Sequence, residues 1–250
     1  MPKGIAVQPE SIQAATHTAG AATGRLTLVI PALDEAGTIL RVLDRVLAVP
    51  LPVEREVIVV DDGSSVRTAD LVLSLGHPEV KLLRHKTNQG KGAAIRTALA
   101  HATGDLLLIQ DADLEYAPEV IPSLLAALVD SKADAVYGSR FLGTCEGMRL
   151  PNRIGNWVLA RAATLLYGHR ITDEATAYKL FRTEVLRSLP LRCRGFEFCP
   201  EVTGLLLRGG YRLVEAPIAY RARTHKEGKK IGWRDGVQAL WTLPRCRLGR

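Results

Sequence analysis

Short apolar runs alternate with amphipathic stretches between residues 25 and 139. The runs are rich in β-branched residues and predict strands at residues 26–31, 56–61, 80–84, 105–110 and 134–138. Between them, apolar residues recur every three or four positions, which predicts helices over residues 36–48, 65–75, 90–101 and 117–129. Alternation of this kind predicts an α/β fold with a Rossmann-like, mostly parallel central sheet and helices on both faces.

Beyond residue 140 the pattern is less regular, and it predicts helices near 151–167, 183–189 and 198–208 and a strand near 211–215. We expect a flexible tail over residues 1–24, one domain over residues 25–230 and a basic amphipathic C-terminal segment over residues 231–250. The opening residues lack the apolar centre of a signal peptide, and no run approaches the ~18–20 apolar residues of a membrane span. We therefore expect a cytoplasmic protein.

The charge of the chain is divided unevenly between its two halves. The 250 residues include 33 Lys and Arg against 26 Asp and Glu, which alone suggests a basic protein with nucleic acid as a natural partner. Residues 1–139, however, carry 12 basic and 17 acidic side chains, whereas residues 140–250 carry 21 and 9. This division predicts cation binding in the first half and anion binding in the second. The four cysteines form no C-x-x-C pair, so they indicate reduced thiols and no zinc knuckle.

Acidic residues follow the first two predicted strands. Asp34 and Glu35 come after the first, and Asp61 and Asp62 end the second. Helix capping would explain either pair, but two acidic turns at adjacent strand ends also place carboxylate acceptors along one crevice. There they could receive N–H and O–H groups of a base and a ribose. Residues 88–92, with Lys91 between two glycines, open a helix in a way that suits anion binding, without Walker A spacing.

Three further acids, Asp111, Asp113 and Glu115, follow the most apolar predicted strand. Their i, i+2, i+4 spacing points them in roughly one direction while the chain is extended. Three like charges so close repel one another unless a cation or a proton relieves them. Hard oxygen ligands with few neighbours suit Mg²⁺ or Mn²⁺, which retain water and bind a diphosphate. A solvated acidic loop is the alternative.

The basic half supplies candidate anion ligands. Arginine grips phosphate in a bidentate manner, and a departing diphosphate needs its charge offset. The candidates are Arg140, Arg149, Arg153, Arg223 and Lys230. Asp173, Glu174 and Glu197 are acids in the same half, and each is a base, a salt-bridge partner or neither.

In order and spacing, these motifs resemble those of GT-A glycosyltransferases of family two. The resemblance rests on residues 29–35, 60–64, 88–92, 111–113, 138–140 and 227–231, and it is strongest to the dolichyl- or polyprenyl-phosphate mannose and glucose synthases. It implies an inverting transfer of a hexose from a nucleotide-sugar, of GDP-mannose or UDP-glucose type, to a polyprenyl or dolichyl phosphate. Asp34 stands where the family motif usually has Asn.

The resemblance also assigns roles to individual residues. It implies catalytic roles for Asp113 and Arg140, and a Mg²⁺ or Mn²⁺ site formed by Asp111, Asp113 and Glu115. It implies acceptor-phosphate binding by Arg140, Arg149 and Arg153. The implied nucleotide-sugar set is Pro31, Asp34, Glu35, Asp61, Asp62, Lys91, Asp111, Ala112, Arg223 and Lys230.

A lipid acceptor raises the question of how the chain reaches a membrane. In a helix over residues 231–241, Trp233, Val237, Leu240 and Trp241 would share one face beside basic residues. We expect this segment either to dock at the cytoplasmic face of a membrane or on a membrane subunit, or to pack in the core. Nucleic acid is then no longer an expected partner. Two alternatives stay open: a saccharide hydroxyl acceptor, which needs a carboxylate base, and a scaffold that binds membranes without turnover.

Overall fold

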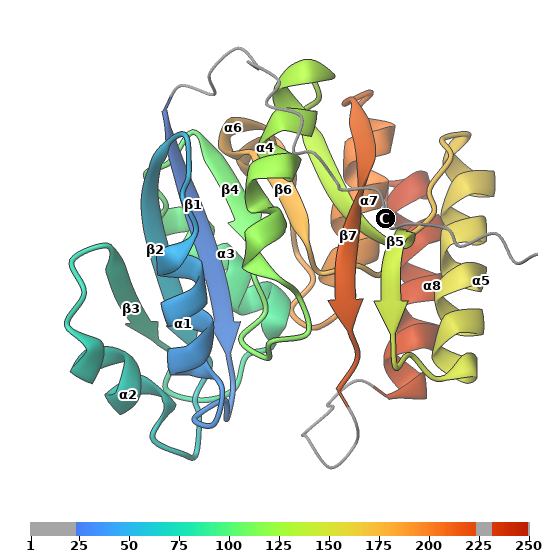
Figure 1. Cartoon of the computed structure of the whole chain (residues 1–250). Helices are drawn as coiled ribbons and strands as arrows, with labels where there is room; N and C mark the ends of the chain where they lie inside the picture. The colour runs from blue at the N-terminus through green and yellow to red at the C-terminus, as the bar shows by residue number, and fades with distance from the viewer. Residues whose placement is uncertain (1–23, 224–231, 250) are drawn as a thin grey trace, which may run out of the picture.

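The computed structural model describes residues 24–223 and 232–249 (Figure 1). Seven strands of this described part form one sheet in the order β3-β2-β1-β4-β6-β5-β7. The strands are β1 (Arg25–Ala32), β2 (Glu54–Asp61), β3 (Val80–Arg84), β4 (Leu106–Ile109), β5 (Ala135–Glu146), β6 (Lys179–Arg182) and β7 (Leu213–Arg221). The helices are α1 (Ile39–Ala48), α2 (Thr68–Leu75), α3 (Lys91–His101), α4 (Ile121–Asp130), α5 (Leu150–Tyr167), α6 (Thr183–Ser188), α7 (Phe198–Arg208) and α8 (Trp233–Leu248), with a 3-10 turn, η1, at Pro118–Val120.

The sheet is mostly parallel, as the sequence predicts. β1 pairs in parallel with β2 and β4, β2 with β3, and β5 with β7. β6 is the exception, because it lies antiparallel between β4 and β5. A strand that runs backwards begins where its neighbours end. The residues just before Lys179 therefore enter at the edge of the sheet formed by the carboxyl ends of the other strands.

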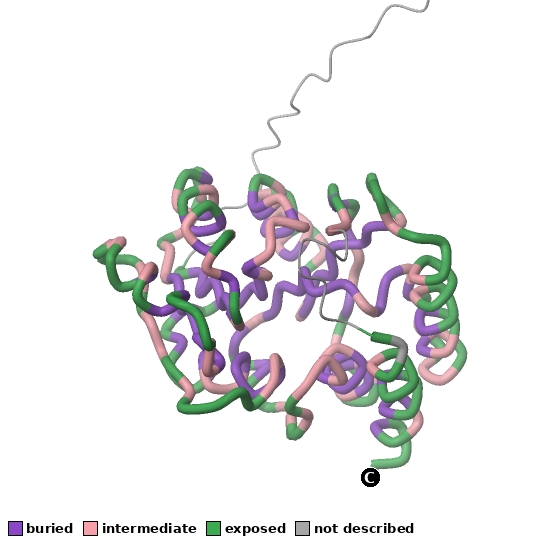
Figure 2. Tube along the Cα trace, turned by 90° about the horizontal axis from the view of Figure 1, so that it is seen from below, coloured by how far each residue is buried: buried purple, intermediate pink, exposed green. Residues whose placement is uncertain are grey.

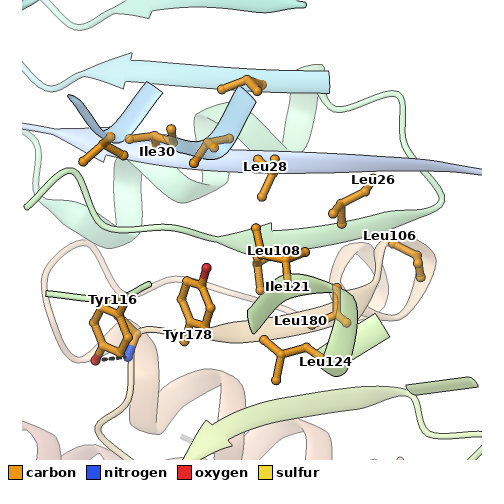
Figure 3. Packing of buried hydrophobic residues seen from close by; sticks show 14 of the residues in the cluster. Leu26, Leu28, Ile30, Leu106, Leu108, Tyr116, Ile121, Leu124, Tyr178 and Leu180 are labelled. Carbon is orange, nitrogen blue, oxygen red and sulfur yellow. Dashed lines mark hydrogen bonds between the residues drawn. The ribbon is translucent and has the colours of Figure 1, made fainter. Parts of the chain in front are cut away.

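Helices cover both faces of the sheet because alternate strand residues point to opposite sides. In β1, Leu26, Leu28 and Ile30 pack into one apolar cluster, while Val29 packs into the other. Figure 3 shows the first cluster, where Ile121 and Leu124 of α4 meet β1, β4 and β6. The second cluster contains residues of α3, α5, α7 and α8. Figure 2 shows the same arrangement, with buried strands at the centre and exposed positions on the outer helices.

The C-terminal helix α8 packs beside α5 and α7 (Figure 1). Ala239 and Leu243 of α8 are buried in the second cluster, and Tyr167 at the end of α5 donates a hydrogen bond to the Leu243 carbonyl (2.7 Å). The described part of the predicted C-terminal segment is thus packed onto the domain. Within residues 24–223 and 232–249, no helix has both the length and the apolar composition needed to cross a bilayer.

Candidate functional site

The carboxyl ends of β1, β2 and β4 meet at one edge of the sheet. Asp61 lies opposite Ala32 at the ends of β2 and β1, and Asp111 lies just beyond Ile109, which pairs with Val29 of β1. The acidic residues that the sequence places after separate strands are therefore neighbours. In open α/β sheets, ligands bind beyond this edge.

Asp34 joins the loops that follow β1 and β2. Its Oδ1 accepts hydrogen bonds from the backbone N–H and the hydroxyl of Ser65 (2.8 and 3.0 Å), and its own N–H donates to the Ser64 hydroxyl (2.9 Å). Asp34 has φ = 51°, a left-handed conformation that Asp tolerates better than most residues. The structure thus gives this residue of the predicted nucleotide-sugar set a bracing position between two loops.

Asp61 and Asp62 are buried and organise the segment that leads to α3. Asp62 accepts the N–H groups of Gln89 (2.9 Å) and Gly90 (2.8 Å), and it lies 2.5 Å from Nδ1 of His85. Asp61 pairs with Arg84 (3.3 Å). Sequence reasoning missed His85, although its position directly after β3 at the same edge is a usable signal. Of the other predicted residues here, Pro31 lies opposite Val60 in the sheet, and the Ala112 side chain packs in the core.

The expected anion site at the start of α3 is not open in this structure. The N–H groups of Gly92 and Ala93 donate to the carbonyls of Gly195 (3.2 Å) and Arg194 (3.0 Å). The first N–H groups of a helix have no acceptor within the helix, and here the loop over residues 190–197 supplies the acceptor carbonyls. This contact comes from a segment about 100 residues away, and no local pattern near Lys91 predicts it. Anion binding by the Lys91 side chain stays a prediction.

Two cations meet three of the predicted acids at this edge of the sheet. Lys91 donates to Asp111 Oδ1 (2.5 Å), and Arg223 binds Asp113 Oδ2 (2.8 Å) and Glu35 Oε2 (3.2 Å). Burial, followed by the neighbouring charges of Asp111 and Glu115, raises the pKa of Asp113 to about 7. Arg223, from the end of the chain, thus joins acids that follow β1 and β4. Lys230 lies outside the described residues.

Glu115, the third predicted metal ligand, shares Arg223 with Asp113 and also binds Tyr220. It accepts hydrogen bonds from the Tyr220 hydroxyl (2.8 Å) and the Arg223 N–H (2.6 Å). Among the described residues, no three His, Cys, Asp or Glu side chains are grouped so that they could hold a metal ion. The donor set nevertheless fits Mg²⁺ or Mn²⁺, because such ions commonly use one or two carboxylates plus substrate phosphates. Asp111 and Asp113 are crowded, hard oxygen donors whose repulsion a cation would relieve.

Arg140 is buried and paired with Asp173. Its Nε and Nη2 donate to the two carboxylate oxygens (2.7 and 2.6 Å), its backbone N–H adds a third bond (2.9 Å), and its guanidinium lies 5.0 Å from the Tyr220 ring centroid. The other predicted acceptor ligands, Arg149 and Arg153, are exposed at the start of α5. Burial raises the pKa of the Cys145 thiol, and the charges of Arg140 and Arg153 both oppose the rise. These two arginines therefore lie within electrostatic reach of one position on β5.

The three candidate bases all face donors inside the protein. Asp173 binds Arg140, and Glu174 is fully buried and accepts a hydrogen bond from the Thr203 hydroxyl (3.1 Å). Burial raises the pKa of Glu174. Glu197 accepts the backbone N–H groups of Arg194 (3.1 Å) and Gly195 (3.0 Å). At least one oxygen of each carboxylate is therefore bound within the protein, while Oε2 of Glu174 is buried without a hydrogen-bond partner.

Comparison with known proteins places this geometry among sugar-transferring enzymes. Residues 27–189 match the family model described as glycosyl transferase family 2. The chain is 31% identical over 247 residues to the undecaprenyl-phosphate mannosyltransferase of Micrococcus luteus. The alignment covers 90% of this chain and 99% of that protein. It is also 28% identical over 222 residues to the dolichol-phosphate mannosyltransferase of Pyrococcus furiosus. That alignment covers 83% of this chain and 60% of that protein.

Solved structures confirm the fold. Glucosyl-3-phosphoglycerate synthase from Mycobacterium tuberculosis, in complex with Mn²⁺, uridine diphosphate and phosphoglyceric acid, aligns with a TM-score of 0.68 at 20% identity, over 90% of this chain and 78% of that one. The same enzyme with Mg²⁺ and uridine diphosphate also gives 0.68, at 23% identity over 90% and 80% of the two chains. The predicted GT-A fold is thus confirmed.

Proposed function

Because the chain belongs to glycosyl transferase family 2 and is a glycosyltransferase, we propose that it moves one hexose from a nucleotide-sugar to a polyprenyl phosphate. One observation carries the proposal. At the carboxyl edge of the sheet, Asp111 and Asp113 face Lys91 and Arg223, cations that come from distant segments. Such an arrangement holds a metal-bound diphosphate with carboxylates on one side and positive charge on the other.

The donor would bind across the ends of β1, β2 and β4. Asp111 and Asp113 would hold the Mg²⁺ or Mn²⁺ ion, which offsets the charge of the departing diphosphate. Solved relatives of the same fold contain these ions with uridine diphosphate, which supports this assignment. Lys91 and Arg223 stand beside these carboxylates and would bind diphosphate oxygens. Buried Asp62 holds the backbone N–H groups of Gln89 and Gly90, and this segment would lie beside the nucleoside.

The acceptor would need no protein base. A lipid monophosphate is already anionic at neutral pH, so it can attack the anomeric carbon directly once two repelling anions are aligned and neutralised. A hydroxyl acceptor would require a carboxylate base, and two of the candidates, Asp173 and Glu174, are fully buried. Asp173 is bound by Arg140 on both oxygens, and Oε1 of Glu197 accepts two backbone amides. This favours a phosphate acceptor over a saccharide hydroxyl. The names of the relatives from Micrococcus luteus and Pyrococcus furiosus support the same choice.

Membrane placement follows from the surface of two neighbouring helices. The first half of α5 exposes Leu150, Ile154 and Trp157, and α8 exposes Val237 and Trp241. In each helix these residues recur at helical spacing and form an apolar stripe. β6 is antiparallel to both β4 and β5, so β5 ends at the donor edge, and α5 begins shortly after it. The stripe on α5 therefore starts beside the site.

The charge on these helices suits an anionic lipid surface. Residues 149–167 contain three arginines and no acidic residue, and residues 233–249 contain three arginines and one aspartate. Exposed Trp flanked by Arg is the composition of interfacial helices, and each basic residue near an anionic surface contributes roughly 1 kcal/mol. We therefore propose that the enzyme acts at the cytoplasmic face of a membrane, with the start of α5 toward the lipid.

An acceptor screen tests the function. The full chain, with Mn²⁺ and radiolabelled UDP-glucose or GDP-mannose, is offered either a polyprenyl phosphate or soluble saccharides. We expect label in the lipid fraction, and its loss when EDTA removes the metal. Soluble saccharides that outperform the lipid phosphate would contradict the proposal. Binding of nucleoside diphosphate and Mn²⁺ without transfer to any acceptor would favour the scaffold alternative.

A further inference from the structure

The loop over residues 190–197 lies against the glycines at the start of α3. A Cβ atom on Gly92 would stand 2.6 Å from the Cys193 carbonyl oxygen, and one on Gly90 would strike the carbonyl of Arg194. Gly90 also has φ = 97°, which disfavours any other residue. These glycines therefore allow two backbone segments to approach closely, and the loop caps α3 through Gly92 and Ala93.

Two carboxylates from the start of α7 fix the shape of this loop. Glu197 Oε1 accepts the N–H groups of Arg194 (3.1 Å) and Gly195 (3.0 Å). Glu201 accepts those of Arg192 (2.8 Å) and Cys193 (3.0 and 3.1 Å). The N–H groups of residues 194 and 195 are thus bound to Glu197, while their carbonyls point to α3. Glu197 orients the peptide groups that cap the helix.

The helix that they cap begins with Lys91. Its Nζ donates to Asp111 Oδ1 (2.5 Å) and lies 5.9 Å from the ring centroid of Phe196, which belongs to the same loop. Burial alone would lower the pKa of Lys91, but the neighbouring charges, that of Asp111 first, together raise it. The loop therefore binds the backbone of the two residues that follow Lys91, and its Phe196 ring lies near the Lys91 side chain.

We propose that Glu197 is a positioning residue for the donor site. Through the Arg194 and Gly195 peptide groups it fixes the first turn of α3, and through that turn it aims Lys91 at Asp111 and at the donor diphosphate. The proposal rests on the function proposed above and deepens it. This role requires no proton transfer, which distinguishes it from that of a general base, a group that takes a proton from the acceptor.

Binding measurements separate these two roles. The full chain and its variants are titrated with UDP and with GDP in the presence of Mn²⁺, and donor KM and kcat are measured alongside. Glu197→Ala removes the hydrogen bonds from the Arg194 and Gly195 N–H groups. We expect the nucleotide Kd and the donor KM to rise about ten-fold, with kcat changing less than three-fold. Glu197→Gln retains an acceptor oxygen and should stay within about two-fold of the native chain, with an unchanged pH profile. Glu184→Ala, on exposed α6, is the matched control.

A double-mutant cycle covers the possibility that Glu197→Ala merely loosens the fold. If Glu197 acts through Lys91, adding Glu197→Ala to Lys91→Ala should raise the Kd less than two-fold further. Full additivity would overturn the proposal, as would equal loss of activity in Glu197→Gln and Glu197→Ala, which is the signature of a base. These titrations use no acceptor. The outcome of the binding test is therefore independent of whether the chain glycosylates polyprenyl phosphate, and failure of the one proposal can be told from failure of the other.

Discussion

Two regions of the molecule differ in the exposure of their charged side chains. The donor edge is the edge of the sheet where β1, β2 and β4 end, and the α5–α8 surface consists of the exposed side chains of these two helices, including Trp157 and Trp241. At the donor edge, the acids Asp62, Asp111 and Asp113 are each held by donors from other segments, and all are largely shielded from water. On α5, Arg149 and Arg153 are exposed beside apolar side chains such as Trp157. A preformed network of this kind suits a small, highly charged ligand. An exposed basic and apolar surface suits an extended partner such as a lipid surface. The uneven charge of the sequence thus corresponds to two modes of binding.

The largest expected effect lies at the donor edge. Asp113→Ala removes one of the two carboxylates proposed to hold the metal, and we expect transfer to fall by at least about 10³-fold. Initial rates with UDP-glucose or GDP-mannose and Mn²⁺ measure this, and circular dichroism checks the fold. Asp44→Ala, on the exposed side of α1, should keep its activity. Substantial metal-dependent transfer by Asp113→Ala would separate this residue from the reaction.

The next effect concerns stability where the two regions meet. Asp173→Ala leaves the buried Arg140 charge uncompensated, and such a loss costs about 3–5 kcal/mol. Glu119→Ala breaks the exposed pair with Arg45 and should cost less than about 1 kcal/mol. Urea unfolding at neutral pH compares the two variants. Equal free energies of unfolding would mean that burial does not set the strength of the Arg140 pair.

A smaller effect should appear on the α5–α8 surface alone. Replacing Trp157 and Trp241 with Ser removes two exposed aromatic rings, and we expect vesicle affinity to fall about ten-fold for each. Co-sedimentation with anionic vesicles measures binding, while UDP and GDP titrations should stay unchanged. Leu73→Ser, equally exposed but on α2, is the control. If it weakens vesicle binding as much as either Trp variant, the surface assignment is wrong.

The smallest effect tests the charge on the same surface. Arg149→Gln and Arg153→Gln should each weaken binding to anionic vesicles about five-fold, in line with roughly 1 kcal/mol per basic residue. Raising the salt concentration should reduce this difference because exposed charges are screened. Neutral vesicles are the control, since binding to them should not respond to either variant. A loss of equal size on neutral vesicles would point to packing in place of charge.

Most of the first half of the fold could be predicted from local patterns. The apolar runs that predict β1 to β4 are short, β-branched and separated by clear helical periods, so their positions agree with the structure within a few residues. β6 escaped because it has only four residues and begins with Lys179, a residue type that is rarely buried. Its antiparallel direction depends on pairing with β4 and β5, which lie far from it in the sequence. No local period encodes such a pairing.

The candidate site divides in the same way. Acids after adjacent parallel strands must share an edge, so the grouping of Asp62 with Asp111 could be predicted from topology alone. Their partners could not, because Arg223 reaches Asp113 from 110 residues away, and Arg140 meets Asp173 in the segment that leads into the unexpected strand β6. Glu115 illustrates the limit. Its spacing predicts a shared direction with Asp111 and Asp113, but the chain turns after Asp113, and Leu114 adopts φ = 63°.

The close approach at Gly90 and Gly92 has a consequence for engineering. A library that seeks new donor specificity would naturally randomise residues 88–92, where the lysine lies. Most substitutions at either glycine would collide with the backbone of residues 193–195, so the screen would mainly recover misfolded chains. Residues 88–92 and 190–197 therefore behave as one design unit. Productive diversity lies in side chains such as Phe196, which reach Lys91 without entering the contact between the two backbones.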